Sequence, residues 1–338
     1  MISIKKLLDR FRLHNADEYA EAEGDKLGTL RGGGTGCFYR DGRNQLKVTG
    51  KCPRLSHLRS LGIQPSNDEH SQHMFDGGYA NEHRWVEKMK AVWKGTVRTE
   101  EEIPMIWSTT NGTVVTGRPD IVLCLDSQSI DGPEPMHGLE LKNVSSLWTA
   151  REVLFKGRPK MNHLLQSGHY SLKLGVPWSL CYTSSSKYPV IESLGKTKIR
   201  WPESGAALSE HVEYDQWGDG KPFARSIQPF VQIYDIDSRS DLDCIRYRIE
   251  GTTEWTETNL SANGIIAYYE HVSKIKETGD LGPRPTELKV DGARESYSQC
   301  DGCPFAKACD NYDGGRKRGS PEGHQDYEQW ITEIGETY

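Results

Sequence analysis

Two short motifs near the middle of the chain carry carboxylates and an amine at spacings suited to phosphate chemistry. They are Gly117-Arg118-Pro119-Asp120 and, further on, Glu140-Leu141-Lys142. Side chains two apart on a β-strand point to the same face, so Glu140 and Lys142 would share one. Two carboxylates can hold a hard divalent cation, and an ammonium group beside them can stabilise charge on phosphate or activate the attacking water. The motifs therefore indicate hydrolysis of a phosphodiester.

Both motifs lie in segments whose residues favour β-strands. Thr113–Leu125 is rich in β-branched side chains, and His137–Val144 is a short run between turn-forming residues. Two such strands side by side would bring Asp120 next to Glu140. A solvated strand with alternating charges would give the same letters, as Glu287–Lys289 shows. That second copy follows two prolines and has no Gly-x-x-Asp strand before it, so we interpret it as surface.

The composition describes a chain that can bury a large core but is not a polycation. Of its 338 residues, 27% are charged and 35% are hydrophobic, and the net charge is −6. This length suits one elaborated domain or two small ones. A nucleic-acid partner would therefore bind a local basic groove and not the surface as a whole.

The sequence shows no signal for export or for a membrane. No apolar run approaches the ~20 residues that a membrane-spanning helix needs. The first ten residues lack an apolar core and a small-residue cleavage site. We therefore expect no membrane contact and a cytoplasmic location. In that reducing compartment, clustered members of the eight cysteines are expected to bind metal and not to form disulfides.

Three segments are expected along the chain. Residues 1–50 would hold an amphipathic helix over residues 2–23 and a flexible connector at Gly32–Gly36, which lacks the Gly-Lys-Ser/Thr of a phosphate loop. Residues 51–310 would form the main domain, with a Gly-, Pro- and charge-rich insertion at about 195–225. Residues 311–338 would form a C-terminal tail.

Two helices could present polar side chains to the paired carboxylates. The pattern of Asp76–Trp93 predicts a helix just before the first motif, with His83 on its apolar face. A histidine there is more often a satisfied core residue, but it could also reach a metal, and a nitrogen ligand would favour Mn²⁺. Met161–Leu174 predicts a helix on which Gln166 and Tyr170 face the same side. This pair could be an ordinary polar stripe or could position a substrate strand.

The remaining periodic segments complete an α/β pattern. The further predicted elements are, in chain order, helix Leu55–Leu61, an antiparallel pair of Glu101–Ile106 and Thr113–Leu125 around Asn111-Gly112, helix Leu147–Phe155, strand Trp178–Ser184, a hairpin of Phe230–Asp237 and Asp243–Glu250, and helix Leu260–Thr278 capped by Asn259 or Ser261.

A second group of chemistry-bearing residues lies near the C-terminus. Cys300, Cys303 and Cys309 could supply three thiolates to one centre, which suits an iron–sulfur cluster or zinc. A fourth ligand must come from upstream, and Cys52, at the start of a predicted helix, is the best candidate. The remaining cysteines are expected in the Gly-rich loop (Cys37) or inside strands (Cys124, Cys181 and Cys244).

Taken in order, these residues resemble the RecB-like branch of the PD-(D/E)xK nuclease superfamily. More closely, they are similar to the iron–sulfur exonucleases related to CRISPR-associated RecB-like nucleases and to the nuclease domains of AddB-type helicase–nucleases. The resemblance covers about residues 50–310. The matching motifs are Cys52, His83, Asp120, Glu140 with Lys142, Gln166 with Tyr170, and Cys300, Cys303 and Cys309.

The resemblance implies an α/β fold with a PD-(D/E)xK core, in which helices flank a mixed central sheet. An iron–sulfur clasp would join the N- and C-terminal regions. The clasp's four ligands to a [4Fe-4S] cluster would be Cys52, Cys300, Cys303 and Cys309.

The resemblance also implies the roles of the central residues. The groups that would bind Mn²⁺ or Mg²⁺ are His83, Asp120, Glu140 and the carbonyl of Leu141. Lys142 would activate or orient the attacking water. Gln166 and Tyr170 would position the scissile strand.

The implied activity is exonuclease cleavage of single-stranded DNA ends, often from the 5′ end. It would serve recombination, repair, phage DNA processing or CRISPR-like adaptation in a bacterial, archaeal or phage-infected cell. The chain has no Walker motif, so a helicase or recombination protein, or a second copy, would be a separate partner. A structure-specific or restriction-like endonuclease would use the same residues. A metal-stapled DNA-binding protein without activity is the alternative from another class.

Overall fold

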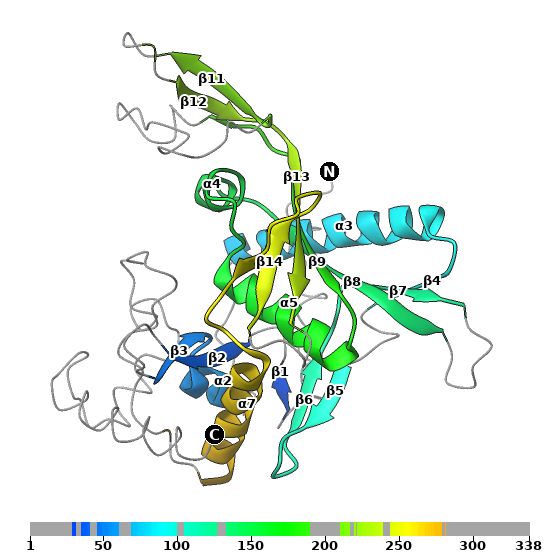
Figure 1. Ribbon diagram of the computed structural model, residues 1–338, viewed down its shortest axis with the longest axis vertical. Coiled ribbons are helices and arrows are strands. Elements are labelled where there is room, and N and C mark those ends of the chain that lie inside the picture. Colours follow the sequence, from blue (N-terminus) through cyan, green and yellow to red (C-terminus); the bar gives the residue numbers. More distant parts are fainter. Residues whose placement is uncertain are drawn as a thin grey trace, which may run out of the picture.

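The protein has a mixed α/β fold with a central mixed sheet flanked by helices, as the sequence predicted (Figure 1). The computed structural model describes residues 29–31, 35–40, 46–60, 69–99, 105–126, 133–189, 210–216, 220, 222–238, 244–278 and 281. In this part of the chain no helix is long and apolar enough to cross a membrane.

The central sheet has seven strands in the order β15-β14-β13-β9-β8-β7-β4. Only β8 and β9 run parallel, and their neighbours pair antiparallel. The strands are β4 (Thr96–Thr99), β7 (Ile121–Leu125), β8 (Glu134–Asn143), β9 (Trp178–Ser184), β13 (Phe230–Asp237), β14 (Arg246–Ile249) and β15 (Thr256–Glu257).

Three smaller sheets and five helices complete the described fold. The sheets are β1-β6-β5 (Leu30–Arg31, Val114–Gly117 and Met105–Ser108), the hairpin β2-β3 (Gly36–Arg40 and Leu46–Gly50), and β10-β12-β11 (Tyr188–Pro189, Pro222–Ile227 and Val212–Gln216). The helices are α2 (Pro53–Ser60), α3 (Glu69–Val92), α4 (Leu147–Phe155), α5 (Met161–Leu174) and α7 (Ala262–Thr278).

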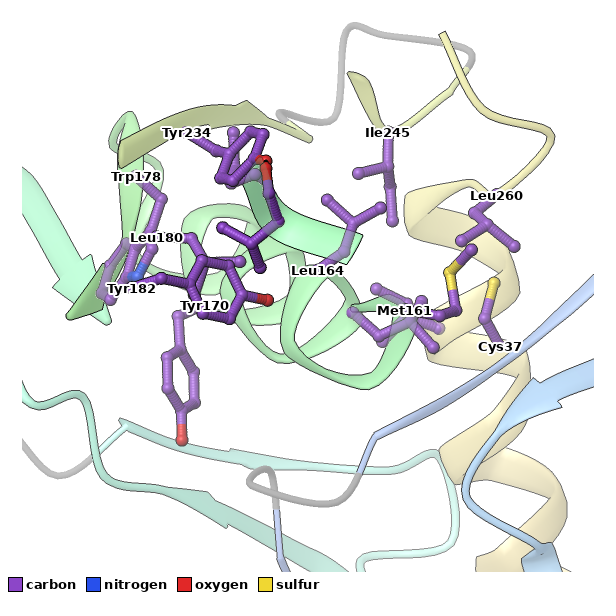
Figure 2. Close-up of a cluster of buried hydrophobic side chains, with 14 of the residues drawn as sticks. Cys37, Met161, Leu164, Tyr170, Trp178, Leu180, Tyr182, Tyr234, Ile245 and Leu260 are labelled. Carbon is purple, nitrogen blue, oxygen red and sulfur yellow. Dashed lines mark hydrogen bonds between the residues drawn. The ribbon is translucent and has the colours of Figure 1, made fainter. Parts of the chain in front are cut away.

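The two faces of the central sheet are covered by different helices. On one face, Leu139 and Leu141 of β8 share a hydrophobic cluster with Val86 of α3. On the other face, Leu180 and Tyr182 of β9 join the main core with α4, α5 and α7 (Figure 2). Because side chains alternate along a strand, Glu140 and Lys142 are directed to the opposite face, which α5 covers.

The parallel pair β8–β9 is joined by α4 and α5, and all three elements after β8 have the bounds that the sequence predicted. Ser146 caps α4, because its hydroxyl oxygen accepts a hydrogen bond from the Thr149 amide at 3.2 Å. Gly138 of β8 faces Trp178 of β9, and a Cβ there would lie 2.1 Å from the indole ring. Glycine at this position therefore allows the buried Trp178 ring to pack directly on the backbone of β8, where β8 and β9 begin to pair.

The predicted strand Thr113–Leu125 is wrong as a single element. The first half, β6, pairs with β5 around the turn at Asn111-Gly112, where Gly112 has φ +80°. The second half, β7, belongs to the central sheet. The chain leaves one sheet for the other at Arg118–Asp120, and Pro119 there has no N–H to give to either ladder.

The described part of residues 1–50 packs into the same core as the main domain. Leu30, Phe38 and Val48 belong to the main hydrophobic cluster, and β1 pairs with β6 in parallel. Cys37 lies in β2 and is fully buried, not in a flexible loop as expected. The described part of residues 1–50 therefore shares one hydrophobic core with later segments of the chain.

The other predictions have mixed outcomes. The predicted insertion at about 195–225 contains β11 and the first four residues of β12, so it is built partly of sheet. The β13–β14 hairpin is confirmed, and Ser261 caps α7 by accepting from the Gly264 amide at 3.0 Å. The helix predicted at residues 2–23, the Glu287–Lys289 surface strand and the tail at 311–338 lie outside the described residues.

Candidate active site

The antiparallel pair β7–β8 brings the two motifs together. Ile121 of β7 is paired with Leu139 of β8, so Asp120, at the start of β7, comes beside Glu140 and Leu141. The carboxylate oxygen Oδ2 of Asp120 accepts a hydrogen bond from the main-chain N–H of Leu141 at 2.6 Å. The expectation that the two motifs lie on neighbouring strands is confirmed.

Glu140 is a fully buried carboxylate with one oxygen paired and one unsatisfied. Its Oε1 accepts from Nζ of Lys142 at 2.5 Å, so the two side chains share a face as predicted. Its Oε2 has no hydrogen-bond partner among the described residues. A buried carboxylate oxygen without a partner is costly unless a ligand completes it.

The electrostatics of Glu140 follow from burial. Burial, and then the negative charge of Asp120, raise the pKa of Glu140 from 4.5 to about 8, against the opposite effect of Lys142. Glu82 of α3 raises this pKa further. Near neutral pH the protonated form of the carboxyl is therefore favoured, and a cation beside it would favour the ionised form.

Lys142 remains an ammonium group in this environment. Burial lowers the pKa of Lys142, but the charges of Glu140, Asp120 and Glu82 outweigh that effect and raise it. Its side chain keeps 22% exposure, while Glu140 has none. Lys142 is therefore the more exposed partner of this pair, although its amine lies largely buried beside the carboxylate.

Helix α5 places Gln166 and Tyr170 over the first motif. The Tyr170 hydroxyl accepts from the Arg118 amide and from Nε2 of Gln166, and it donates to the Arg118 carbonyl, each at 3.3 Å. Burial, and then the charge of Glu140, raise the pKa of Tyr170 well above its ordinary value, so the phenol stays neutral. This pair therefore fixes the backbone next to Asp120.

Gly117 makes room for that contact. A Cβ at Gly117 would lie 2.6 Å from Cε1 of Tyr170 and 2.5 Å from Cε of Met105. The tyrosine ring is 1% exposed and cannot swing into solvent. The glycine of the first motif thus serves the approach of Tyr170 to the Arg118 backbone.

Helix α3 contributes a carboxylate that the sequence reasoning missed. Asn81 ties the helix to β9 through a hydrogen bond from Nδ2 to Oγ1 of Thr183 at 2.9 Å. The next residue, Glu82, acts on the pKa of both Glu140 and Lys142. His83 is exposed on the same helix, so its predicted place on the apolar face is wrong, while its proposed role as a ligand stays a prediction. The sequence did contain a signal for Glu82, since it is a carboxylate directly before His83. Mg²⁺ and Mn²⁺ bind carboxylates readily.

A second missed group lies beside Lys142 on the α5 side. Tyr182 is the parallel-strand partner of Lys142. Its hydroxyl accepts from the Lys160 amide and is bonded to Nδ1 of His163, both at 2.9 Å. Burial, and then the charges of Lys142 and Lys160, lower the pKa of His163 well below its ordinary value, so this imidazole is neutral.

The donor set fits a divalent cation in chemistry, although it is not a closed cage. Within the described residues no group of three His, Cys, Asp or Glu side chains converges on one point. The unsatisfied Oε2 of Glu140 and the neighbouring carboxylate of Asp120 supply hard oxygen atoms at one place. The Leu141 carbonyl and a side chain of α3 would have to complete the coordination.

The described cysteines divide into core residues and one candidate ligand. Burial raises the pKa of Cys37 and of Cys181 to about 12, and Cys124 is also fully buried. The prediction that Cys124 and Cys181 lie inside strands is confirmed. Cys244 is half-buried and precedes β14, so its placement inside a strand was wrong.

Cys52 is half-buried at the start of α2. Arg54, two residues on, donates from Nε to the carbonyl of Leu281 at 3.3 Å, so the chain after α7 returns to this point. The three other predicted cluster ligands lie outside the described residues: Cys300, Cys303 and Cys309.

Comparison with known proteins adds little to this geometry. No protein-family profile and no curated protein matches the chain. A solved structure described as the crystal structure of LHK-Exo in complex with dAMP is similar at 14% identity. The similarity covers 62% of this chain and 81% of that one, with a TM-score of 0.28. A TM-score of that size does not establish a shared fold.

Proposed function

We propose that this protein is a metal-dependent deoxyribonuclease of the PD-(D/E)xK class that cuts single-stranded DNA from its ends. The observation that carries the proposal is the state of Glu140. It is fully buried, one oxygen contacts Lys142, the other has no partner among the described residues, and Asp120 lies on the adjoining strand. A structural ion pair does not require that second oxygen to be left open.

The proposed mechanism assigns each group a separate task. Asp120 and Glu140 would hold Mn²⁺ or Mg²⁺ with the Leu141 carbonyl, and Glu82 or His83 would add a ligand from α3. A bound cation supplies Lewis-acid polarisation of the phosphate and a more acidic water. Lys142, beside Glu140, would stabilise charge on the phosphate or orient the water.

Gln166 and Tyr170 act as positioning residues in this mechanism. Tyr170 holds the backbone of Arg118 on both its N–H and its carbonyl, two residues before Asp120. The carboxylate of Asp120 is in turn held by the Leu141 amide. Small displacements of catalytic groups are costly in rate, so a rigid approach to Asp120 supports catalysis.

The proposal includes a [4Fe-4S] clasp held by Cys52 and the three C-terminal cysteines. The Arg54–Leu281 contact brings the chain beside α2. Position 300 lies nineteen residue-to-residue steps after position 281 (300 − 281 = 19), which can span on the order of 60 Å when extended. A return to Cys52 is therefore within reach, and zinc is the alternative ion.

Iron content and colour test the clasp without reference to catalysis. Anaerobically purified protein is expected to be brown and to contain iron, and Cys52→Ala should lose both. Cys37→Ala is the matched control, because Cys37 is buried in β2 and bonded to main-chain carbonyls. Iron lost from Cys37→Ala and kept by Cys52→Ala would overturn this ligand set.

Linear and circular substrates test the activity. End-labelled linear single-stranded DNA and its closed circle are incubated with Mn²⁺, with Mg²⁺ and with EDTA. We expect metal-dependent release of short products from the linear strand only, and 5′ against 3′ labels give the polarity. Equal cutting of the circle would support the endonuclease alternative. Binding without any cutting under both metals would support a DNA-binding protein.

A further inference from the structure

The segment that follows Lys142 combines an exposed tryptophan with concentrated positive charge. Trp148, on the first turn of α4, is 54% exposed, which is unusual for so large an apolar side chain. The guanidinium of Arg151 lies over its ring at 5.8 Å from the centroid. A tryptophan held open to solvent beside an arginine offers a flat surface for another planar group.

The charge of this segment contrasts with that of the whole chain. Residues 148–160 contain four basic residues and one acid, giving +3 (4 − 1), whereas the chain carries −6. The acid, Glu152, is bonded to both Lys156 and Arg158, at 2.7 and 2.9 Å. These two ion pairs hold the turn between α4 and α5 in one shape while the net charge stays positive.

The basic segment borders the candidate active site at both of its ends. Its first turn is capped by Ser146, four residues after Lys142 on the same chain. At its other end, the Lys160 amide donates to Tyr182, the parallel-strand partner of Lys142. A phosphate at Lys142 would therefore have this segment beside it.

We propose that residues 148–160 form the binding track for the single strand, with an unpaired base stacked on Trp148 and the adjoining phosphates held by the basic side chains. This inference rests on the proposed function, since it names how the substrate of that site is held. Stacking needs an exposed base face, which a single strand offers and the interior of a duplex does not. The local charge matches a phosphate backbone, and a net negative protein needs such a track to bind DNA at all.

Binding can be measured apart from cleavage by using Glu140→Gln as the common background. The probes are fluorescein-labelled thirty-residue oligo(dT) and a blunt thirty-base-pair duplex, followed by anisotropy. Adding Trp148→Ala should weaken binding to the single strand by about tenfold or more, in the range that loss of one base–aromatic stack gives. Trp148→Phe should keep most of the affinity, and duplex binding should change little.

The chain offers matched controls for both components of the track. Trp255, just before β15, also lies against arginines, with Arg246 and Arg248 of β14 at 4.7 and 4.6 Å from its ring, but at the outer edge of the sheet. Trp255→Ala should leave oligo(dT) binding unchanged. Lys160→Gln should reduce the slope of log K against log salt by about 0.7, the value for one phosphate contact on a single strand. Lys187→Gln, immediately before β10, should leave that slope unchanged.

The outcomes separate this inference from the proposed function. No loss in a folded Trp148→Ala variant, or an equal loss in Trp255→Ala, overturns the stacking site, whether or not the wild type cuts DNA. An equal loss on single strand and duplex also overturns it. Absence of cleavage by the wild type, together with a loss specific to Trp148→Ala, would instead overturn the nuclease proposal and leave the binding track standing.

Discussion

The main-chain N–H of Leu141 donates to Oδ2 of Asp120 at 2.6 Å, across the junction of β7 and β8. This bond makes the position of one motif depend on the register of the other. Leu141 is buried against α3, so its amide is fixed by packing. The carboxylate of Asp120 is thereby held beside Glu140 before any cation binds.

Glu140 predicts a specific dependence of stability on pH. Its folded pKa of about 8 lies above the ordinary 4.5, so the protonated form is favoured by folding. Stability from this group is complete below about pH 4.5, falls as pH rises toward 8, and is lost above that. Glu140→Gln should abolish this part of the decline between pH 5 and 8. Melting temperatures of both proteins across that range check it.

Metal addition should oppose the same decline. Mn²⁺ or Mg²⁺ at the ionised Glu140 would raise the melting temperature of the wild type most at pH 8, where burial penalises the ionised carboxylate most. The Glu140→Gln variant should respond much less. A wild type that melts at one temperature with and without either metal would contradict a cation at Glu140.

Tyr170→Phe should separate a positioning role from a structural one. The change removes three 3.3 Å hydrogen bonds around the hydroxyl and should cost about 1 kcal/mol in unfolding free energy. Tyr234→Phe is the control, because Tyr234 is equally buried and donates to the Val153 carbonyl at 2.6 Å. Both variants should lose stability, but only Tyr170→Phe should lower kcat. Equal kcat values in the two variants would show that Tyr170 has a structural role only.

Gly117→Ala should disturb the same contact from the other side. The new methyl group would force the buried Tyr170 ring or Met105 to move, which should cost about 1–3 kcal/mol of stability and reduce activity. Gly78→Ala in α3 meets no atom within 4 Å and should stabilise the protein by about 0.5–1 kcal/mol. Urea unfolding of both variants gives the comparison. A neutral Gly117→Ala would show that the ring has room.

Helix α3 offers a choice between two neighbouring ligands. Glu82→Gln should raise the Mg²⁺ and Mn²⁺ concentrations needed for half-maximal activity, because Glu82 is the α3 residue whose charge acts on Glu140 and Lys142. His83→Ala should alter the Mn²⁺ requirement selectively if its imidazole coordinates. Metal titrations of the two variants decide between them. Unchanged titrations for both would remove α3 from the metal site.

The sequence predicted the crossover from β8 to β9 well, because its signals are local. Ser146 marks the start of α4, and the apolar periodicity of α5 stops at Gly175 and Pro177. Glu140 and Lys142 share a face because period-two alternation depends only on the strand itself. The ends of such elements are set by residues at or next to the ends, so the sequence alone predicts them.

The errors concern contacts between distant parts of the chain. Thr113–Leu125 looked continuous because its β-branched residues favour strand on both sides of Pro119, yet β6 pairs with β1 and β7 with β8. Cys37 was placed in a loop because the burial of β2 against α7 is a tertiary effect. Glu82 was missed because the rotation of α3 relative to the sheet is set by packing, which no helical pattern contains.

Cleavage by four single variants tests the central claim most directly. Wild type, Asp120→Asn, Glu140→Gln, Lys142→Ala and Glu287→Ala are assayed on end-labelled linear single-stranded DNA with Mn²⁺, and folding is checked by circular dichroism. We expect the first three variants to lose cleavage by at least a hundredfold while remaining folded, and Glu287→Ala to cut like the wild type. Loss of cleavage in Glu287→Ala with activity retained in Glu140→Gln would show that the active centre lies elsewhere.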